Sequence, residues 1–412
     1  MRHLLAYGNS DQASFRDPEV GECFDIMTVP STIASYYPDA TAAFVLSSKL
    51  DYLIEPRTPL FQGILNDPRA SHYSLAQEMG PAVQAKIGAP NANGPNPSVN
   101  FSPSFYTAQV CAEIVGQLVR FQREYGQRAD NVGKQIARYA DLLRKARGDT
   151  AESQVVSLRR SPALVLCPYF ACESVSDPWW SVVKQIWYQA EMIESPDQIC
   201  PVVSLGDVFQ LSNAIDLVPD SLSDTIFIWV PGFDEKRASV SELLELRRSV
   251  VSNSRGRELI NLYGGFFSIL LSKFGLAGFN NGLGYSESRQ WPTLDATGAA
   301  PARFYVRRLH AYLPTATATA LVEQDPKLRC KCPVCKNGNR RPNELNYHEL
   351  KRHFALARSW ELQLTLKRTV DELCSKLRSD AARIRAALKR LPRSLNVRVE
   401  HLERWADVLS AP

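Results

Sequence analysis

The sequence has no apolar run that approaches the roughly 18 to 20 residues needed to span a bilayer. The apolar stretch at its start, within residues 1–8, is too short for a secretory signal. The cysteine count is odd, at nine, and three cysteines stand close together, which argues against a disulfide framework. Internal repeats and low-complexity tracts are absent from the sequence as well. We therefore expect a globular chain in the reducing cytoplasm.

The sequence also has little net charge of either sign: the formal net charge is only +5 over 412 residues. The charge is unevenly spread: from Lys351 onward there are 14 Lys and Arg against 7 Asp and Glu, so the rest of the chain is slightly acidic. A basic surface on a near-neutral body is typical of a contact with nucleic-acid phosphates. It is equally typical of solvated helices, and both interpretations stay open.

Short apolar segments rich in β-branched residues alternate with longer amphipathic ones, which predicts strands separated by helices. Polar or Gly residues follow most of the predicted strands, as in a parallel sheet closed by crossovers, and seven or eight such units over about 300 residues favour a (β/α)8 TIM barrel. The predicted strands are 24–30, 41–46, 50–55, 163–170, 202–205, 225–231, 258–263 and 302–306, and the main predicted helices are 105–125, 128–147, 179–193, 239–252 and 266–274. We divide the chain into a barrel (1–320), a zinc-binding module (321–365) and a basic helical tail (366–412).

The most specific motif is the run Cys330, Cys332 and Cys335, in which Pro333 and Gly338 supply tight turns. Three thiols at this spacing converge on one ion when a fourth ligand comes from a following helix. His353 lies on such a helix, predicted over 350–366, and is our choice for the fourth ligand, with His348 as the alternative. A closed Cys3His site holds Zn²⁺ structurally and leaves no coordination position for chemistry.

Catalytic groups in a TIM barrel lie where the strands end, at the C-terminal face. The carboxylates there include Glu55, Asp234 and Glu287, and a pair of them can act as nucleophile and general acid/base in glycosidic chemistry. Glu55 stands on a loop stiffened by two prolines, whereas Asp234 is equally well interpreted as a helix N-cap. Further polar or Gly positions at strand ends are Asp51, Asp207, Glu235, Gly264, Gly265, Asn280, Asn281 and Arg289.

Glycine at 264 and 265 lets a flat ligand approach the backbone, or simply forms a tight strand-to-helix turn. The run from Asn280 through Gly282 to Gly284 lacks the following helix and acidic residue of a dinucleotide fingerprint, which excludes that class of site.

The cysteine run after the last predicted strand, with a later histidine, resembles the zinc site of the tRNA-guanine transglycosylase superfamily, including its DNA-modifying branch. The resemblance extends over about residues 20–365 and implies a zinc-bearing TIM barrel that exchanges a guanine for a 7-deazaguanine through a covalent Asp–nucleotide intermediate. Residues 55–62 stand where the family has Asp-Ser-Gly-Gly-Phe-Gln with its general acid/base, which places Glu55 in that role. Gly264 and Gly265 resemble the turn that binds the base, and Asn280, after Phe279, stands where the family has its nucleophilic Asp. The gap from Cys335 to His353 resembles the DNA-modifying branch.

Two functions follow from this resemblance and its departures. In the first, the chain is a nucleobase transglycosylase in which Glu55, Asp234 and Glu287 are the catalytic candidates, Gly264, Gly265, Asn280 and Arg289 bind substrate, and the basic tail contacts DNA or tRNA. In the second, the chain is a catalytically inactive nucleic-acid-binding or partner subunit of a DNA-modification or phage-defence system, because the amide of Asn280 cannot form a glycosyl ester. A hydrolase for a small glycosylated metabolite is a third class. Expected partners are nucleic acid, a 7-deazaguanine-type base, and either a second copy of the chain or another protein.

Overall fold

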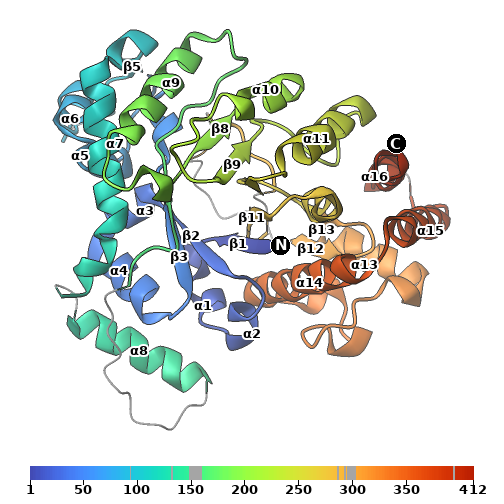
Figure 1. The fold of residues 1–412 in the computed structure, drawn as a ribbon. Coiled ribbons are helices and arrows are strands. Elements are labelled where there is room, and N and C mark those ends of the chain that lie inside the picture. The colour runs from blue at the N-terminus through green and yellow to red at the C-terminus, as the bar shows by residue number, and fades with distance from the viewer. Residues whose placement is uncertain are drawn as a thin grey trace.

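A computed structural model describes residues 1–92, 94–130, 133–147, 160–284, 287–291, 294, 303–392 and 395–412. Its centre is a parallel sheet with the strand order β7-β6-β3-β2-β1-β11-β10-β9-β8 (Figure 1). The strands at the two ends of this order, β7 and β8, are consecutive parts of one strand interrupted at Pro201. The sheet therefore closes on itself as an eight-stranded (β/α)8 barrel, which confirms the predicted fold class. The barrel strands are β1 (Arg2–Ala6), β2 (Ile26–Pro30), β3 (Asp51–Glu55), β6 (Leu164–Leu166), β7 (Ile199–Cys200), β8 (Val202–Ser204), β9 (Thr225–Trp229), β10 (Glu258–Asn261) and β11 (Gly278–Gly282).

The structure differs from the predicted strands at three places: one predicted strand is a helix, one is a strand outside the barrel, and one barrel strand was not predicted. Residues 41–46 lie in helix α4 (Pro38–Ser47), which starts with proline at its first position and is buried on almost every side, so its apolar run has no periodicity to separate helix from strand. Residues 303–306 form β12 (Arg303–Val306), which pairs with β13 (Ala311–Pro314) in an antiparallel hairpin outside the barrel, and Ala302 lies outside the described residues. The first barrel strand, β1, lies at residues 2–6, where the sequence analysis predicts no strand.

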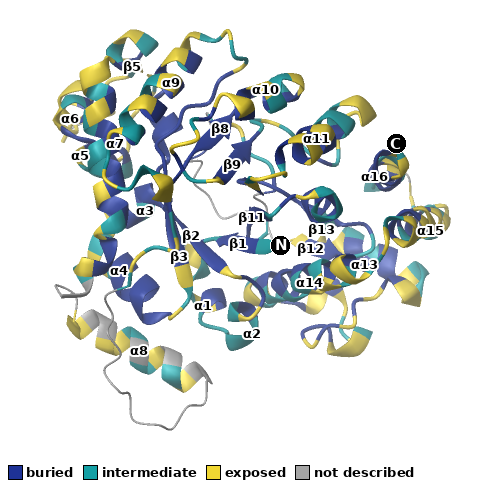
Figure 2. Cartoon of the chain, in the orientation of Figure 1, coloured by how far each residue is buried: buried dark blue, intermediate teal, exposed yellow. Residues whose placement is uncertain are grey.

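Helices surround the barrel and turn their buried faces toward it, while their exposed faces form the surface (Figure 2). The longest ones confirm the predicted helical segments and are amphipathic or capped at their start; α11, for example, begins at a Ser239–Glu242 capping box. The helices of the barrel region are α1 (Gln12–Phe15), α2 (Pro18–Gly21), α3 (Ser31–Tyr36), α4, α5 (Ala70–Met79), α6 (Pro81–Ile87), α7 (Ala108–Arg123), α8 (Gly133–Arg147), α9 (Pro178–Glu191), α10 (Leu211–Asp216), α11 (Val240–Asn253) and α12 (Phe266–Leu271). A small hairpin of β4 (Gly63–Leu65) and β5 (Val99–Phe101) lies beside them.

The two faces of each barrel strand separate into an outer and an inner layer. Leu5 of β1 and Tyr7 just after it belong to the apolar cluster that contains the buried side chains of α4, so they point outward. Because side chains alternate along a strand, Leu4 and Ala6 point into the barrel. Residues that pair in register on adjacent strands point to the same side of the sheet. Leu4 pairs with Asn280 of β11, and Ala6 pairs with Thr28 of β2. Asn280 and Thr28 therefore also face the interior.

The segment after the barrel is firmly attached to it. Helices α13 (Thr315–Gln324), α14 (Tyr347–Lys367), α15 (Val370–Leu388) and α16 (Glu400–Ser410) follow the β12–β13 hairpin. Trp405 of α16 is fully buried and donates through Nε1 to the carbonyl of Glu235 at 2.9 Å, and Arg247 of α11 donates to the last carbonyls of the chain. The predicted basic tail is thus a packed helical pair. No helix among the described residues has the length and apolarity that a membrane crossing requires.

Candidate functional site at the barrel mouth and the adjoining cysteine cluster

Glu55 is the last residue of β3 and points into the C-terminal mouth of the barrel. Its side chain is 1% exposed. Oε1 accepts hydrogen bonds from the hydroxyls of Tyr169 (2.7 Å) and Tyr263 (3.0 Å), and Oε2 pairs with Nε of Arg57 at 2.5 Å. The structure therefore gives the predicted Glu55 a fixed orientation between two phenols and one guanidinium.

Arg57 is a residue that the sequence interpretation missed. Its backbone is left-handed, with φ of 56°, which is unfavourable for a residue with a side chain. Burial alone would lower the pKa of Arg57, but the carboxylate of Glu55 outweighs it and the pKa lies above its ordinary value. Nη1 of Arg57 also donates to the carbonyl of Leu294 at 2.5 Å, and Arg289 donates to the same oxygen at 3.2 Å. The segment after β11 is thereby held across the mouth by two arginines.

Aromatic rings line the mouth around Glu55. Tyr169, Trp229 and Tyr263 follow or end three strands of the barrel, and the ring of Trp229 lies 6.1 Å from that of Tyr169 and 5.2 Å from that of Tyr263. The guanidinium of Arg289, which was predicted to bind substrate, lies 5.9 Å from the ring of Tyr263. The sequence shows an aromatic residue at or after each of these three strands. It does not show that the three strand ends lie side by side, so this group of rings was not predicted.

The predicted glycine pair forms a crowded turn between β10 and α12. A Cβ on Gly264 would lie 2.4 Å from Oγ of Ser268, and one on Gly265 would lie 2.7 Å from Oε2 of Glu235. Glu235 accepts from the backbone N–H groups of Gly265 and Phe267, both at 2.9 Å, and from the hydroxyl of Ser268. Burial raises the pKa of Glu235 despite these donors. Close packing is the structural reason for glycine at both positions, against Ser268 at position 264 and against the Glu235 carboxylate at position 265.

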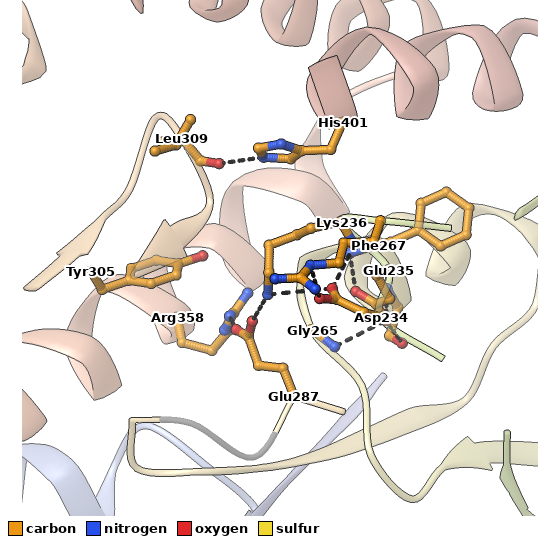
Figure 3. Close-up of polar contacts among 12 residues, drawn as sticks. Asp234, Glu235, Lys236, Gly265, Phe267, Glu287, Tyr305, Leu309, Arg358 and His401 are labelled. Atoms are coloured by element: carbon orange, nitrogen blue, oxygen red, sulfur yellow. Dashed lines mark hydrogen bonds and ion pairs between the residues drawn. The ribbon is translucent and has the colours of Figure 1, made fainter. Parts of the chain in front are cut away.

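Asp234 and Glu287, the other two predicted catalytic carboxylates, lie close together around Lys236 (Figure 3). Asp234 is partly exposed; its Oδ1 accepts from the backbone N–H of Lys236 at 2.9 Å, so it stabilises a turn, while Ser239 is the N-cap of α11. Glu287 is buried and bonds Nζ of Lys236 at 2.7 Å and the guanidinium of Arg358. Burial acts against its ionisation, but these two cations lower the pKa of Glu287 below its ordinary value. Asp234, whose Oδ2 lies 3.4 Å from Nε of Arg237, is thus the more accessible of the two, whereas Glu287 is buried with its two cations.

Arg358 connects this carboxylate to a second one on its own helix, α14. It is fully buried and also pairs with Glu361 at 3.1 Å, which in turn accepts from the hydroxyl of Tyr305 and contacts Nδ1 of His310 at 2.7 Å. Burial raises the pKa of Glu361 to about 8. Arg358 thus pairs with both Glu287, in the loop after β11, and Glu361, on α14, and these two ion pairs join the loop to the helix.

The raised pKa of Glu361 gives a pH prediction. A carboxyl that takes up a proton more readily in the folded than in the unfolded chain adds stability at low pH, and this contribution is lost as pH rises toward the folded pKa. We expect Glu361 to reduce the free energy of unfolding progressively between about pH 5 and 8, and Glu361→Gln to flatten that decline. Chemical denaturation of both proteins across this range measures it. Parallel pH profiles for the two proteins would contradict the assignment.

Asn280, the predicted counterpart of a nucleophile, is completely buried inside the barrel. Its Nδ2 donates to the carbonyl of Leu262 at 2.9 Å, whereas its Oδ1 has no hydrogen-bond partner among the described residues. The side chain is therefore oriented by the neighbouring strand and presents an acceptor to the barrel interior.

The four predicted metal ligands come together in a buried cluster. Candidate ligand atoms of Cys330, Cys332, Cys335 and His353 all lie within 4.8 Å of one another, and Nδ1 of His353 is 3.4 Å from Sγ of Cys332 and 3.5 Å from Sγ of Cys335. Nε2 of His353 lies 2.8 Å from the carbonyl of Tyr305, a contact that makes Nε2 the donor and leaves Nδ1 as the ligand atom. His348, the alternative, is exposed and outside the cluster. This donor set fits a metal ion.

The chain was compared with protein-family models, with curated proteins and with solved structures, and none of the three comparisons found a match. The geometry of the barrel mouth and of the cysteine cluster is therefore the basis for a functional proposal.

Proposed function

We propose that the chain is a transglycosylase-like protein that acts on guanine in DNA or tRNA. The observation that supports this most directly is Glu55: a buried carboxylate at the C-terminal end of a barrel strand, oriented by Arg57 and two tyrosine hydroxyls and walled by aromatic rings. Aromatic faces suit a planar base, and an oriented carboxylate suits attack at, or proton transfer near, a glycosidic carbon.

The roles divide among the strand ends. Glu55 is the nucleophile or general acid/base at the mouth, and Asp234 is the second carboxylate, since its side chain is partly exposed. Glu287 holds Lys236 and Arg358 in place. Arg289 contributes a cation beside Tyr263, where a phosphate or a base edge would approach.

The cysteine cluster supports the proposal as a structural zinc site. Three thiolates and one imidazole are the donor set that Zn²⁺ takes in closed tetrahedral sites, where the metal stabilises the fold and leaves no position for substrate. The hydrogen bonds from Cys330 and Cys335 lower the pKa of Cys332, so one thiolate is already favoured. All nine cysteines are free and buried, which fits the reducing cytoplasm that we propose as its location.

A base-exchange assay tests the proposal. The protein is incubated with radiolabelled guanine and either tRNA or duplex DNA, and incorporation into the nucleic acid is measured. Glu55→Gln keeps the size of the side chain but removes its charge, and we expect it to slow incorporation by at least about 100-fold. Glu124→Gln, a matched change at an exposed position on the barrel surface, should leave the rate unchanged. Exchange that proceeds equally well in Glu55→Gln would refute the catalytic role.

The second candidate function, a nucleic-acid-binding or partner subunit without base exchange, is favoured by Asn280. Its amide occupies the interior position where the resembling family has a nucleophilic carboxylate, and it is held there by Leu262. In this case the assay shows no incorporation into either nucleic acid, while binding to one of them weakens steeply with salt. Exchange that depends on Glu55 excludes this candidate.

A further inference from the structure

A solvent-accessible cleft lies on the helices that follow the barrel. Helices α13 and α15 lie side by side (Figure 1), and the cleft between them has a volume of about 580 Å³. Its floor is formed by Ser379, Ala382 and Ala386, exposed residues that recur every three or four positions and therefore share one face of α15. Gln324 and Asp325, at the end of α13, form the opposite wall. The volume is within the range of roughly 300 to 1,000 Å³ that small-molecule sites have.

Two arginines that line this cleft contact the same wall. Arg383 lies within α15, and Arg390 follows the end of this helix, about two turns later. Nη1 of Arg383 donates to Oδ2 of Asp325 at 2.9 Å, and Nη1 of Arg390 donates to the carbonyl of Gln324 at 3.4 Å. Because Gln324 and Asp325 are consecutive residues, the two guanidinium groups converge at one end of the cleft.

The carboxylate at this end of the cleft does not balance the cations around it. Oδ1 of Asp325 accepts from the backbone N–H of Lys327 at 2.9 Å, and this bond, with Arg383 and the charge of Lys327, lowers the pKa of Asp325 and keeps it ionised at neutral pH. Arg390 forms no ion pair with a carboxylate that the structure describes. Arg383, Arg390 and Lys327 therefore bring three positive charges against the one negative charge of Asp325, an excess of two.

We propose that this cleft binds a small phosphate monoester. Its phosphate group lies between Arg383 and Arg390, and its organic part lies over Ala382 and Ala386. A phosphate monoester carries a charge of about −1.5 to −2 at neutral pH, which matches the positive excess, and its oxygens suit two planar guanidinium groups. A carboxylate ligand brings only one charge and meets the competing carboxylate of Asp325.

The size of the cleft favours an ester over inorganic phosphate, which fills only the end beside the arginines. The methyl groups of Ala382 and Ala386 leave the rest of the floor low, and Ser379 presents a hydroxyl toward the start of α15. This space suits the compact organic part of a nucleotide or of a sugar phosphate. None of the residues that line the cleft lies at the barrel mouth, so the site does not depend on base exchange.

Calorimetric titration of the full chain at low ionic strength with adenosine monophosphate, glucose 6-phosphate and inorganic phosphate tests the site. We expect at least one of the two esters to bind more tightly than inorganic phosphate. Arg390→Gln should weaken the binding of that ester about tenfold or more, because it removes a charged hydrogen-bond donor to the phosphate. Arg378→Gln removes the same charge from an exposed residue of α15 that pairs with Asp407, and it should leave the affinity unchanged.

Two further variants test the charge and the floor of the cleft separately. Asp325→Asn keeps the N-cap of the short helix Pro326–Leu328 but removes the competing charge, so it should tighten ester binding severalfold. Ala386→Leu fills the floor and should weaken ester binding without changing the affinity for inorganic phosphate. Thermal melting of each variant checks that it is folded.

The outcomes are independent of the catalytic proposal. Ester binding that falls in Arg390→Gln and rises in Asp325→Asn supports the site whether or not the chain exchanges a base. The site is overturned if neither ester binds more tightly than inorganic phosphate, or if Arg390→Gln and Arg378→Gln bind the ester equally well.

Discussion

Replacing Arg358 by methionine should lower the free energy of unfolding by about 3 to 5 kcal/mol, the typical cost of removing one partner from a buried ion pair. Arg358 is completely buried between Glu287 and Glu361, and its guanidinium also lies over the rings of Tyr305 and Phe354. Methionine retains most of the stem volume but leaves the buried carboxylate of Glu287 with only Lys236 as a cation and removes the partner of Glu361. Urea denaturation followed by circular dichroism measures the loss.

The control for this prediction is an exposed ion pair in the same region of the chain. Arg378→Met breaks the solvent-exposed pair with Asp407 on α16 and should cost about 1 kcal/mol or less, because water and salt screen such pairs. Adding Glu287→Gln to Arg358→Met removes the carboxylate charge that has lost its guanidinium and should restore part of the stability. Equal losses for Arg358→Met and Arg378→Met would mean that the buried network does not hold the loop after β11 to α14.

Much of the fold follows from the sequence because the buried strands have a distinctive composition. The segments that became β2, β3, β6, β8, β9 and β10 are short, apolar and followed by polar residues or glycine, which parallel barrel strands require. The failures have physical reasons. Residues 41–46 form a helix buried on almost every side, and such a helix lacks the polar face that marks helical periodicity. β1 contains five residues at the very start of the chain, and only its pairing with β2 and β11 identifies it as a strand.

The candidate site was predictable where its residues form a local pattern. The ligand set of Cys330, Cys332, Cys335 and His353 needs only a tight loop followed by a helix, and the structure brings all four together. By contrast, the surroundings of Glu55 come from strands that are more than a hundred residues apart, and those of Asn280 depend on the register between β1, β2 and β11. Register is a property of the closed barrel, so no single segment of sequence encodes it.

Disrupting the cysteine cluster is the second change for which we expect a large effect. The cluster lies between the β12–β13 hairpin and α14, since His353 contacts the Tyr305 carbonyl on one side and the cysteine loop on the other. On our proposal, zinc would join this loop to α14, and structural zinc sites contribute their binding free energy to folding. Loss of the ion should therefore release the loop from α14 and lower the melting temperature by about 10 °C or more.

Elemental analysis and thermal melting of Cys335→Ser measure this expectation together. The unaltered protein should contain about one zinc per chain, and Cys335→Ser should lose most of it, because serine does not supply the thiolate that a Cys3His site requires. Cys374→Ser is the matched control: this thiol is equally buried on α15 and donates to the Ala406 carbonyl, so its replacement should cost some stability but no zinc. If the unaltered protein contains no zinc, or if both variants retain it equally, then the cluster of Cys330, Cys332, Cys335 and His353 does not depend on a zinc ion held by Cys335. The transglycosylase proposal would then depend on Glu55 alone.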